Sequence, residues 1–257
     1  GDVYKRQEMN RSRIPIRAGK YVNESVTGTS SNRANPFFMI GRSSTTEDYG
    51  ECYGFNLIYS GNHYEAAQVN SYGKLRLVSG INPATFSYII EAGKCFEAPE
   101  AVLTYSYKGY NRMSHNMHEF VRKHIVRGSW RDKERPVLIN SWEAAYFNIN
   151  ERKLVKLAKA AKDTGVELFV MDDGWFGERN DDTSSLGDWT PNSRKLPNGI
   201  AGIADKIKES GLKFGIWVEP EMVNVKSRLY EKHPEWVVDI PEKPHSEGRN
   251  QRILDLS

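Results

Sequence analysis

The region that follows Arg135 alternates apolar runs of strand length with amphipathic helical segments, and this alternation limits the possible folds more than any other feature. The apolar runs are PVLINSW, VELFVMDD and LKFGIWVEPEM. Between them lie ERKLVKLAKAAKDTG, for which Asn150 is the predicted N-cap, and IAGIADKIKESG, and both segments end in glycine. Repeated strand–helix–strand units predict a parallel sheet with right-handed crossover connections.

Beyond these runs we expect a short helix at about 226–232 and the start of a fourth strand at ILDLS. Such units build either a doubly wound sheet or a (β/α)8 barrel. A glycine-rich phosphate fingerprint would favour the doubly wound sheet, but no GxGxxG, GxxxxGKS or GxxxxGKT follows any of the strands. We therefore predict an incomplete (β/α)8 TIM barrel over residues 135–257, made of the first three βα units and the start of strand 4.

The first part of the chain has a different pattern. Short runs rich in aromatic and β-branched residues are separated by glycine-containing turns, and they read NPFFMIGR, ECYGFNLIYSGNHYEAAQVN, KLRLVSG, TFSYIIEAGKCF and AVLTYSY. This pattern is typical of an antiparallel, all-β sandwich. We assign residues 1–108 to the C-terminal part of such a domain, with 1–7 suspected to be an artefact, and 109–134 to a helical linker with apolar residues at helical spacing.

Composition excludes several classes of partner. The sequence has 36 Lys and Arg against 33 Asp and Glu, without a long block of one sign, so nothing indicates nucleic acid or a membrane surface. No apolar run approaches the ~18 residues of a membrane span, and no signal pattern opens the chain. The only two cysteines, Cys52 and Cys95, lack CxxC spacing and predict reduced, buried thiols. We expect a cytoplasmic protein.

Carboxylates and indoles follow the three apolar runs. They are Trp142 and Glu143, then Asp172 and Asp173, then Trp217, Glu219 and Glu221. Because carboxylates accept hydrogen bonds from sugar hydroxyls and an indole stacks on the C–H face of a sugar, a neutral sugar is the expected ligand. Structural explanations also exist, because adjacent aspartates often cap helices or face solvent, and tryptophans are often core residues. No metal site is expected.

Five motifs in this region resemble those of one known family. RPVLINSWEAAYF, LFVMDDGWFGERNDD, LGDWTPNSRKLPNGI, FGIWVEPEMVN and EGRNQRILDLS, in this order, resemble the bacterial α-galactosidases of glycoside hydrolase family 36. NPFFMIGR and YGECYGFNLIYSGNH resemble the last part of the β-sandwich that precedes the barrel in that family. The resemblance implies retaining hydrolysis of terminal α-galactose from oligosaccharides such as melibiose and raffinose, without a cofactor.

The resemblance also implies roles for individual residues. Asp172 and Asp173 are expected to accept hydrogen bonds from galactose hydroxyls, and Trp217 to form a wall of the pocket. Arg249 is expected to be a further substrate contact that also reduces the repulsion between the aspartates. Trp142 is expected to line the pocket because of its position after the first strand of the barrel. No role carries over to the glutamates that follow Trp217.

No catalytic residue is assigned within the chain. By the resemblance, the nucleophile and the acid/base are aspartates expected downstream of Ser257, so we expect a fragment that is inactive alone. A homo-oligomer, a tetramer, is expected on the same ground. Three alternatives stay open: an α-N-acetylgalactosaminidase or a transglycosidase of the raffinose-synthase kind, a Mg²⁺-dependent phosphate-handling barrel enzyme, and a non-catalytic sugar-binding protein.

Overall fold

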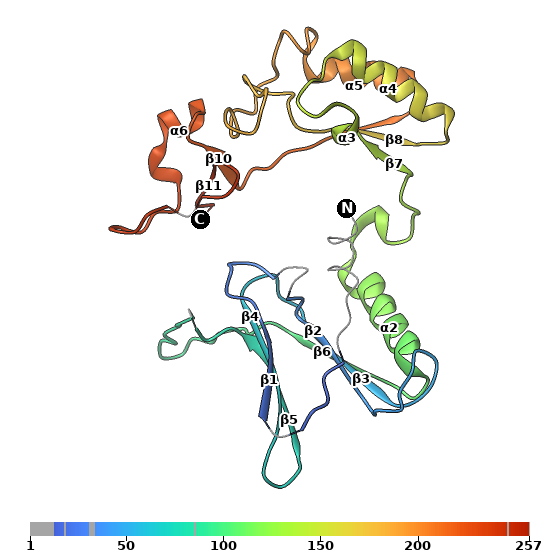
Figure 1. Cartoon of the computed structure of the whole chain (residues 1–257), viewed down its shortest axis with the longest axis vertical. Coiled ribbons are helices and arrows are strands. Elements are labelled where there is room, and N and C mark those ends of the chain that lie inside the picture. The colour runs from blue at the N-terminus through green and yellow to red at the C-terminus, as the bar shows by residue number, and fades with distance from the viewer. Residues whose placement is uncertain (1–12, 18, 31–33, 85, 246, 257) are drawn as a thin grey trace. The chain divides into compact units, whose positions relative to one another are not determined.

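The computed structural model describes residues 13–17, 19–30, 34–84, 86–245 and 247–256, so the suspected artefact at 1–7 lies outside the described residues. The chain forms two compact units, Gly1–Asp132 and Lys133–Ser257. Figure 1 draws the first from blue to green and the second from yellow-green to red. Among the described helices, none is long and apolar enough to cross a membrane.

The first unit contains two antiparallel three-stranded sheets, with the strand orders β1-β4-β5 and β2-β3-β6. At the start of β3, Cys52 and Gly54 are buried and Tyr53 between them is exposed, as in a strand with one buried face. The antiparallel sandwich predicted from the short runs is therefore confirmed. The strands are β1 (Gly19–Glu24), β2 (Phe37–Gly41), β3 (Cys52–Leu57), β4 (His63–Val69), β5 (Leu75–Ile81) and β6 (Ala101–Ser106).

One run predicted as a strand, TFSYIIEAGKCF, forms no strand over its described residues, Phe86 to Phe96. Residues 86–100 have no regular secondary structure beyond a turn. The rings of Phe86 and Tyr88 instead pack on Phe96, with centroids 5.5 and 4.7 Å away. Strand composition is not sufficient here, because no neighbouring strand among the described residues completes a ladder with this segment. Cys95 in this segment is exposed, so the prediction of buried thiols is right for Cys52 alone.

The helix expected as a linker belongs to the core of the first unit. It is α2 (Gly109–Phe120), continued by a π-helical turn at Val121–Ile125 and a 3-10 turn at Gly128–Arg131. Met113 and Met117 of α2 are buried against Cys52 of β3. Figure 1 shows α2 beside β3 and β6. The helical periodicity was predicted correctly. The apolar face of the helix covers a sheet of the first unit, whereas the prediction gave the helix the role of a linker.

The second unit is built on a parallel sheet, β7-β8-β9, as the alternation of strands and helices predicts. The crossovers are helices whose buried residues pack on β8. Asn150 caps the first of them by accepting a hydrogen bond from the Lys153 amide, as predicted. These elements are β7 (Leu138–Asn140), α3 (Trp142–Ala145), α4 (Glu151–Asp163), β8 (Leu168–Met171), α5 (Gly199–Glu209) and β9 (Lys213–Ile216).

The last part of the chain differs from the prediction of a fourth parallel strand. β11 (Gln251–Ile253) pairs antiparallel with β10 (Met222–Asn224) in a separate two-stranded sheet. Between them lie α6 (Arg228–Lys232) and a 3-10 turn at Pro234–Trp236. The run LKFGIWVEPEM is therefore not one strand, because β9 ends at Ile216 and Pro220, which lacks an N–H, separates it from β10.

Candidate functional site

The site is organised around the turn that follows β8. The Asp173 amide donates to Asp172 Oδ1, and the Gly174 amide donates to Asp173 Oδ1, both at 2.6 Å. Gly174 has φ +95°, and a Cβ there would lie 3.0 Å from the Phe147 Cα. Only glycine fits this left-handed, closely packed position, so the turn fixes the directions of both carboxylates.

Arg179 neutralises Asp173 inside the protein. Both side chains are buried, at 0% and 3% exposed. Arg179 Nε donates to Asp173 Oδ1 at 3.0 Å and Nη2 donates to Oδ2 at 2.9 Å, which is the bidentate geometry of a strong charge-assisted pair. Arg249 was expected to reduce the repulsion between the aspartates, but Arg179 is the cation that contacts Asp173. The sequence analysis missed Arg179, although an arginine within an acidic loop directly after the aspartates was a usable signal.

The two aspartates differ in the acceptor capacity that they have left. A carboxylate offers about four lone-pair directions. Asp173 accepts from Gly174 and from Arg179, including a second Nε contact of 3.2 Å to Oδ2. Asp172 is half-buried and accepts only two hydrogen bonds in the described part of the chain, from the Asp173 amide and from Asn140 Nδ2. Asp172 is thus the better placed of the two to accept hydroxyl donors.

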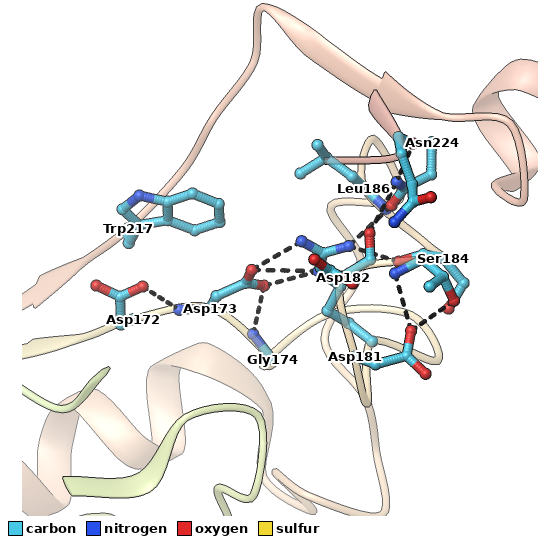
Figure 2. A network of polar contacts seen from close by, with 12 residues as sticks. Asp172, Asp173, Gly174, Asp181, Asp182, Ser184, Leu186, Trp217 and Asn224 are labelled. Carbon is cyan, nitrogen blue, oxygen red and sulfur yellow. Dashed lines mark hydrogen bonds and ion pairs between the residues drawn. The ribbon is translucent and has the colours of Figure 1, made fainter. Parts of the chain in front are cut away.

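Trp217 follows β9 and lies next to this turn. Its amide donates to the Met171 carbonyl at 2.9 Å, which places it beside the end of β8. Its half-buried ring packs with Phe176 at 6.5 Å and with Trp189 at 6.2 Å between centroids. Figure 2 shows the Trp217 ring above the Asp172–Asp173 pair in that view. An indole therefore stands beside the carboxylates, as the sequence predicts for a sugar site.

Trp142 is connected to the same site through Asn140 at the end of β7. The Trp142 amide donates to Asn140 Oδ1 at 2.7 Å, and the amide nitrogen of the Asn140 side chain donates to Asp172 Oδ2. The Trp142 ring packs edge-on against Tyr146 and Phe147, with centroids 5.0 Å away in each case. Its half-buried ring is fixed by these neighbours, and its place beside the ends of the strands matches the predicted position.

Arg249 lies in an exposed turn directly before β11. Arg249 and Asn250 both have positive φ, +54° and +59°. The Asn250 carbonyl accepts from Asn224 Nδ2 at 2.7 Å, and Asn224 Oδ1 accepts from Arg179 Nη1 at 2.8 Å. The structure therefore links the Arg249 turn to Asp173 through two buried side chains. It gives no direct contact between Arg249 and the aspartates among the described residues.

Two further charged groups lie at this end of the sheet. Lys195 Nζ donates to the carbonyls of Phe147, Gly174 and Arg179 at 3.1, 2.8 and 2.7 Å, and burial lowers the pKa of its ammonium. Burial, followed by the negative charge of Glu221, raises the pKa of Glu219, while Arg249 opposes this shift. Lys195 therefore joins three backbone segments around the turn, and burial makes Glu219 easier to protonate than an ordinary glutamate because its pKa is raised.

The donor set does not resemble a divalent-cation site. In the described part of the chain, no group of three or more His, Cys, Asp or Glu residues is placed to hold a metal ion. The Asp173 oxygens already accept from a guanidinium, so the Asp pair offers Mg²⁺ little free carboxylate. What the arrangement can do is accept hydrogen bonds from hydroxyl groups beside an aromatic face.

Comparison with protein families gives two matches that together cover most of the chain. Residues 95–257 match the family described as Melibiase, and residues 6–91 match the domain described as the glycosyl hydrolase family 36 N-terminal domain. The border between the two matches lies in the segment between β5 and β6.

Individual relatives agree with this. Alpha-galactosidase AgaA of Geobacillus stearothermophilus is 50% identical over 245 residues, which cover 95% of this chain and 34% of AgaA. Alpha-galactosidase Mel36A of Lactobacillus acidophilus is 44% identical over 241 residues, covering 94% of this chain and 33% of Mel36A. The chain therefore spans about a third of the length of these relatives.

Solved structures show the same similarity in three dimensions. The crystal structure of AgaA matches with a TM-score of 0.92 at 50% identity, over 95% of this chain and 34% of that one. An AgaA variant solved in complex with raffinose matches with a TM-score of 0.92 at 49% identity and the same coverage. The sequence, the two family matches and the fold agree, and the chain belongs to the melibiase family of glycoside hydrolases, family 36.

Proposed function

We propose that this chain supplies the galactose-recognition part of an α-galactosidase active site. The full-length protein would remove terminal α-galactose from oligosaccharides of the raffinose and stachyose type. Support comes from relatives named alpha-galactosidases and from crystal structures in which AgaA variants hold raffinose or stachyose.

The observation that carries the proposal is the fixed carboxylate turn after β8. Asp172 keeps free acceptor directions, and the half-buried ring of Trp217 stands next to it. A hydrogen bond from a hydroxyl to an ionised acceptor is stronger than one to a neutral acceptor and contributes ~1.5 to 3 kcal/mol. Arg249 and Trp142 are proposed as additional contacts at the edge of the pocket, each connected to the aspartates through one or two side chains.

The proposal assigns recognition, not bond cleavage, to this pair of aspartates. A retaining glycosidase needs a nucleophile and an acid/base carboxyl about 5 to 5.5 Å apart, and the acid must carry a proton. Asp173 is poorly suited to either task, because a buried guanidinium occupies both of its oxygens. The nucleophile and the acid/base are proposed to be residues that follow Ser257 in the full-length protein.

The central test is Asp172→Asn in the full-length protein, assayed on p-nitrophenyl α-galactoside. The substitution keeps the shape of the side chain but replaces an acceptor oxygen with a donor. We expect kcat/KM to fall at least about tenfold, equivalent to ~1.5 kcal/mol of transition-state stabilisation. Asp181→Asn is the matched control, because Asp181 is an exposed aspartate of the same loop that binds Thr183. An unchanged kcat/KM for Asp172→Asn would remove this residue from the site.

The rival activities are separated by substrate. A p-nitrophenyl α-N-acetylgalactosaminide cleaved faster than the galactoside would favour the acetylated sugar, and galactosyl transfer to an acceptor sugar in place of hydrolysis would favour a transglycosidase. Activity that is abolished by EDTA and restored by Mg²⁺ would favour the phosphate-handling enzyme. Galactose binding without turnover by the full-length protein would indicate a sugar-binding protein.

Two properties of the whole protein complete the proposal. A cytoplasmic location is supported by the two cysteines, both of which are free thiols. A homo-oligomer, a tetramer, is proposed from the resemblance alone. Light scattering of the purified full-length protein measures the assembly, and fractionation of the cells measures the location.

A further inference from the structure

Asn224 of β10 is a buried asparagine whose polar side-chain atoms are all in use. It is 0% exposed. Its Oδ1 accepts from Arg179 Nη1 at 2.8 Å and from the Leu186 amide at 2.9 Å. Its Nδ2 donates to the carbonyls of Asp182 and Asn250 at 3.1 and 2.7 Å. A buried amide with this many partners is a junction between segments, because leaving any of its groups unpaired would be costly.

The oxygen side of this junction leads to Asp173. Arg179 donates from Nη1 to Asn224, and from Nε and Nη2 to the carboxylate of Asp173. Nη1 also donates to the Ser184 carbonyl at 2.9 Å. Figure 2 shows this network extending from Asp173 across to Ser184 and Asn224. The planar guanidinium is fixed by partners on opposite sides, so the orientation of the Asp173 carboxylate depends on the position of Asn224.

The nitrogen side of the junction leads to Arg249. Arg249 and Asn250 are consecutive residues with φ of +54° and +59°, a left-handed conformation that residues other than glycine adopt only when their surroundings hold it. The turn is closed by the Gln251 amide, which donates to the Gly248 carbonyl at 3.0 Å. The hydrogen bond from Asn224 Nδ2 to the Asn250 carbonyl holds this turn against the interior of the protein. It therefore fixes the backbone position of Arg249, whose side chain is exposed.

We propose that Asn224 is a positioning residue for the sugar site, which orients Asp173 through Arg179 and orients Arg249 through the Asn250 carbonyl. The two segments are far apart in the sequence and meet on one side chain. This inference rests on the proposed function, because Asp173 belongs to the aspartate pair assigned to galactose recognition and Arg249 is one of the additional contacts proposed above. Asn224 itself is buried and acts only through its neighbours.

Asn224→Asp separates the two sides of the junction. A carboxylate keeps the acceptors for Arg179 and for the Leu186 amide, but it has no donor for the Asn250 carbonyl and places a lone pair against it. The turn that carries Arg249 is therefore released while Arg179 keeps its partner. Asn192→Asp is the matched control, since Asn192 is also buried, accepts from the Arg194 and Lys195 amides, and donates to the Gly177 carbonyl at 2.6 Å.

The first measurement is galactose affinity of the full-length protein, by titration calorimetry, for Asn224→Asp, Arg249→Ala and the double variant. Each single substitution should weaken binding about tenfold, the size expected for one charge-assisted hydrogen bond. Because both act on the same contact, the double variant should lose about tenfold as well, not about a hundredfold. Losses that multiply would overturn the proposal. Asn192→Asp is the control and acts on a different part of the loop, so any loss of galactose affinity that it causes should multiply with the loss from Arg249→Ala.

The second measurement is independent of sugar. Hydrogen exchange at the Gln251 amide should be at least about tenfold faster in Asn224→Asp than in the unmodified protein, and unchanged in Asn192→Asp. Unchanged exchange in Asn224→Asp would overturn the proposal whatever the affinities are. If Arg249→Ala leaves galactose affinity unchanged, the proposed role of Arg249 in sugar binding is wrong, and the role of Asn224 in sugar binding through Arg249 is overturned with it.

Discussion

Asp173 and Glu65 are buried to nearly the same extent, at 3% and 1% exposed, in different units of the molecule. Asp173 pairs with a buried arginine through both of its oxygens. Glu65 in β4 accepts from Asn23 Nδ2 at 2.6 Å and lies 3.7 Å from His63 Nδ1, while its Oε1 has no hydrogen-bond partner among the described residues. Burial raises the pKa of Glu65 to about 7.

The difference shows two ways of burying a carboxyl group. Removing a carboxylate from water costs desolvation free energy. A cation bonded to the carboxylate offsets this cost, and binding a proton avoids it. In the second unit a buried arginine bonds both oxygens of Asp173 and holds this carboxylate in a fixed direction beside the candidate sugar site. Among the described residues of the first unit no arginine or lysine contacts Glu65, and burial raises its pKa to about 7, so its charge depends on pH.

Removal of the cation from Asp173 should have the largest effect. Arg179→Met leaves a buried carboxylate unpaired, and we expect the second unit to lose ~3 to 5 kcal/mol of unfolding free energy. Urea denaturation followed by tryptophan fluorescence measures this, because five of the six tryptophans lie in the second unit. The double variant Arg179→Met/Asp173→Asn should be more stable than Arg179→Met alone. If it is not, the orphaned charge is not the cause of the loss.

Glu65 should give the next largest effect, with a characteristic dependence on pH. The folded-state pKa of about 7 lies above the ordinary value of 4.5, so the folded state binds the proton more tightly than the unfolded state. The first unit should therefore be most stable below pH 4.5 and lose ~2 to 3 kcal/mol as the pH rises to above 7. Glu65→Gln should abolish this loss.

The readout for that prediction is the thiol of Cys52, which is buried in the first unit and becomes reactive when the unit unfolds. Urea midpoints for Cys52 labelling are compared at pH 5 and pH 8. His63→Gln is the control, since its amide can replace the bond from His63 Nε2 to the Ala34 carbonyl while Glu65 is kept. A slope that disappears in His63→Gln and persists in Glu65→Gln would assign the titration to the histidine.

Features set by neighbouring residues could be predicted from the sequence. α4 is recognisable because the helical periodicity, the cap at Asn150 and the terminating Gly165 all lie within one short stretch, and the structure has the helix at Glu151–Asp163. The position of Asp172 and Asp173 is predictable in the same way, because the apolar run that forms β8 ends directly before them.

Features set by distant partners could not be predicted. The segment 86–96 has the composition of a strand, but a strand forms only where another strand completes the ladder. The run ILDLS does not indicate its partner: only its first residue, Ile253, belongs to β11, which pairs with the distant strand β10. The burial of Arg179 also depends on segments far along the chain, since an arginine in an acidic loop is ordinarily solvated.

Lys195 is a cation whose hydrogen bonds in the described part of the chain go to backbone carbonyls and not to a carboxylate, and its removal should have a smaller effect than that of Arg179. Lys195→Met leaves the carbonyls of Phe147, Gly174 and Arg179 without their donor, at an expected cost of ~1 to 3 kcal/mol to the second unit. Thermal unfolding measures this against Lys159→Met, an exposed lysine of α4. A loss as large as that of Arg179→Met would mean that positive charge near Asp173, not its direct pairing, stabilises the turn.

The smallest effect is expected for an ion pair between an arginine and a carboxylate that are both exposed to solvent. Arg194 and Glu178 form an ion pair with their side chains 77% and 63% exposed, in the same loop region as Arg179. Solvent screens such a pair, and ordering two long side chains offsets most of its attraction, so Arg194→Met should cost less than ~1 kcal/mol. The loss should shrink further in 1 M salt, whereas the loss from Arg179→Met should hardly change. Urea denaturation of both variants at low and high salt compares them directly, and similar losses would show that burial is not what distinguishes the two arginines.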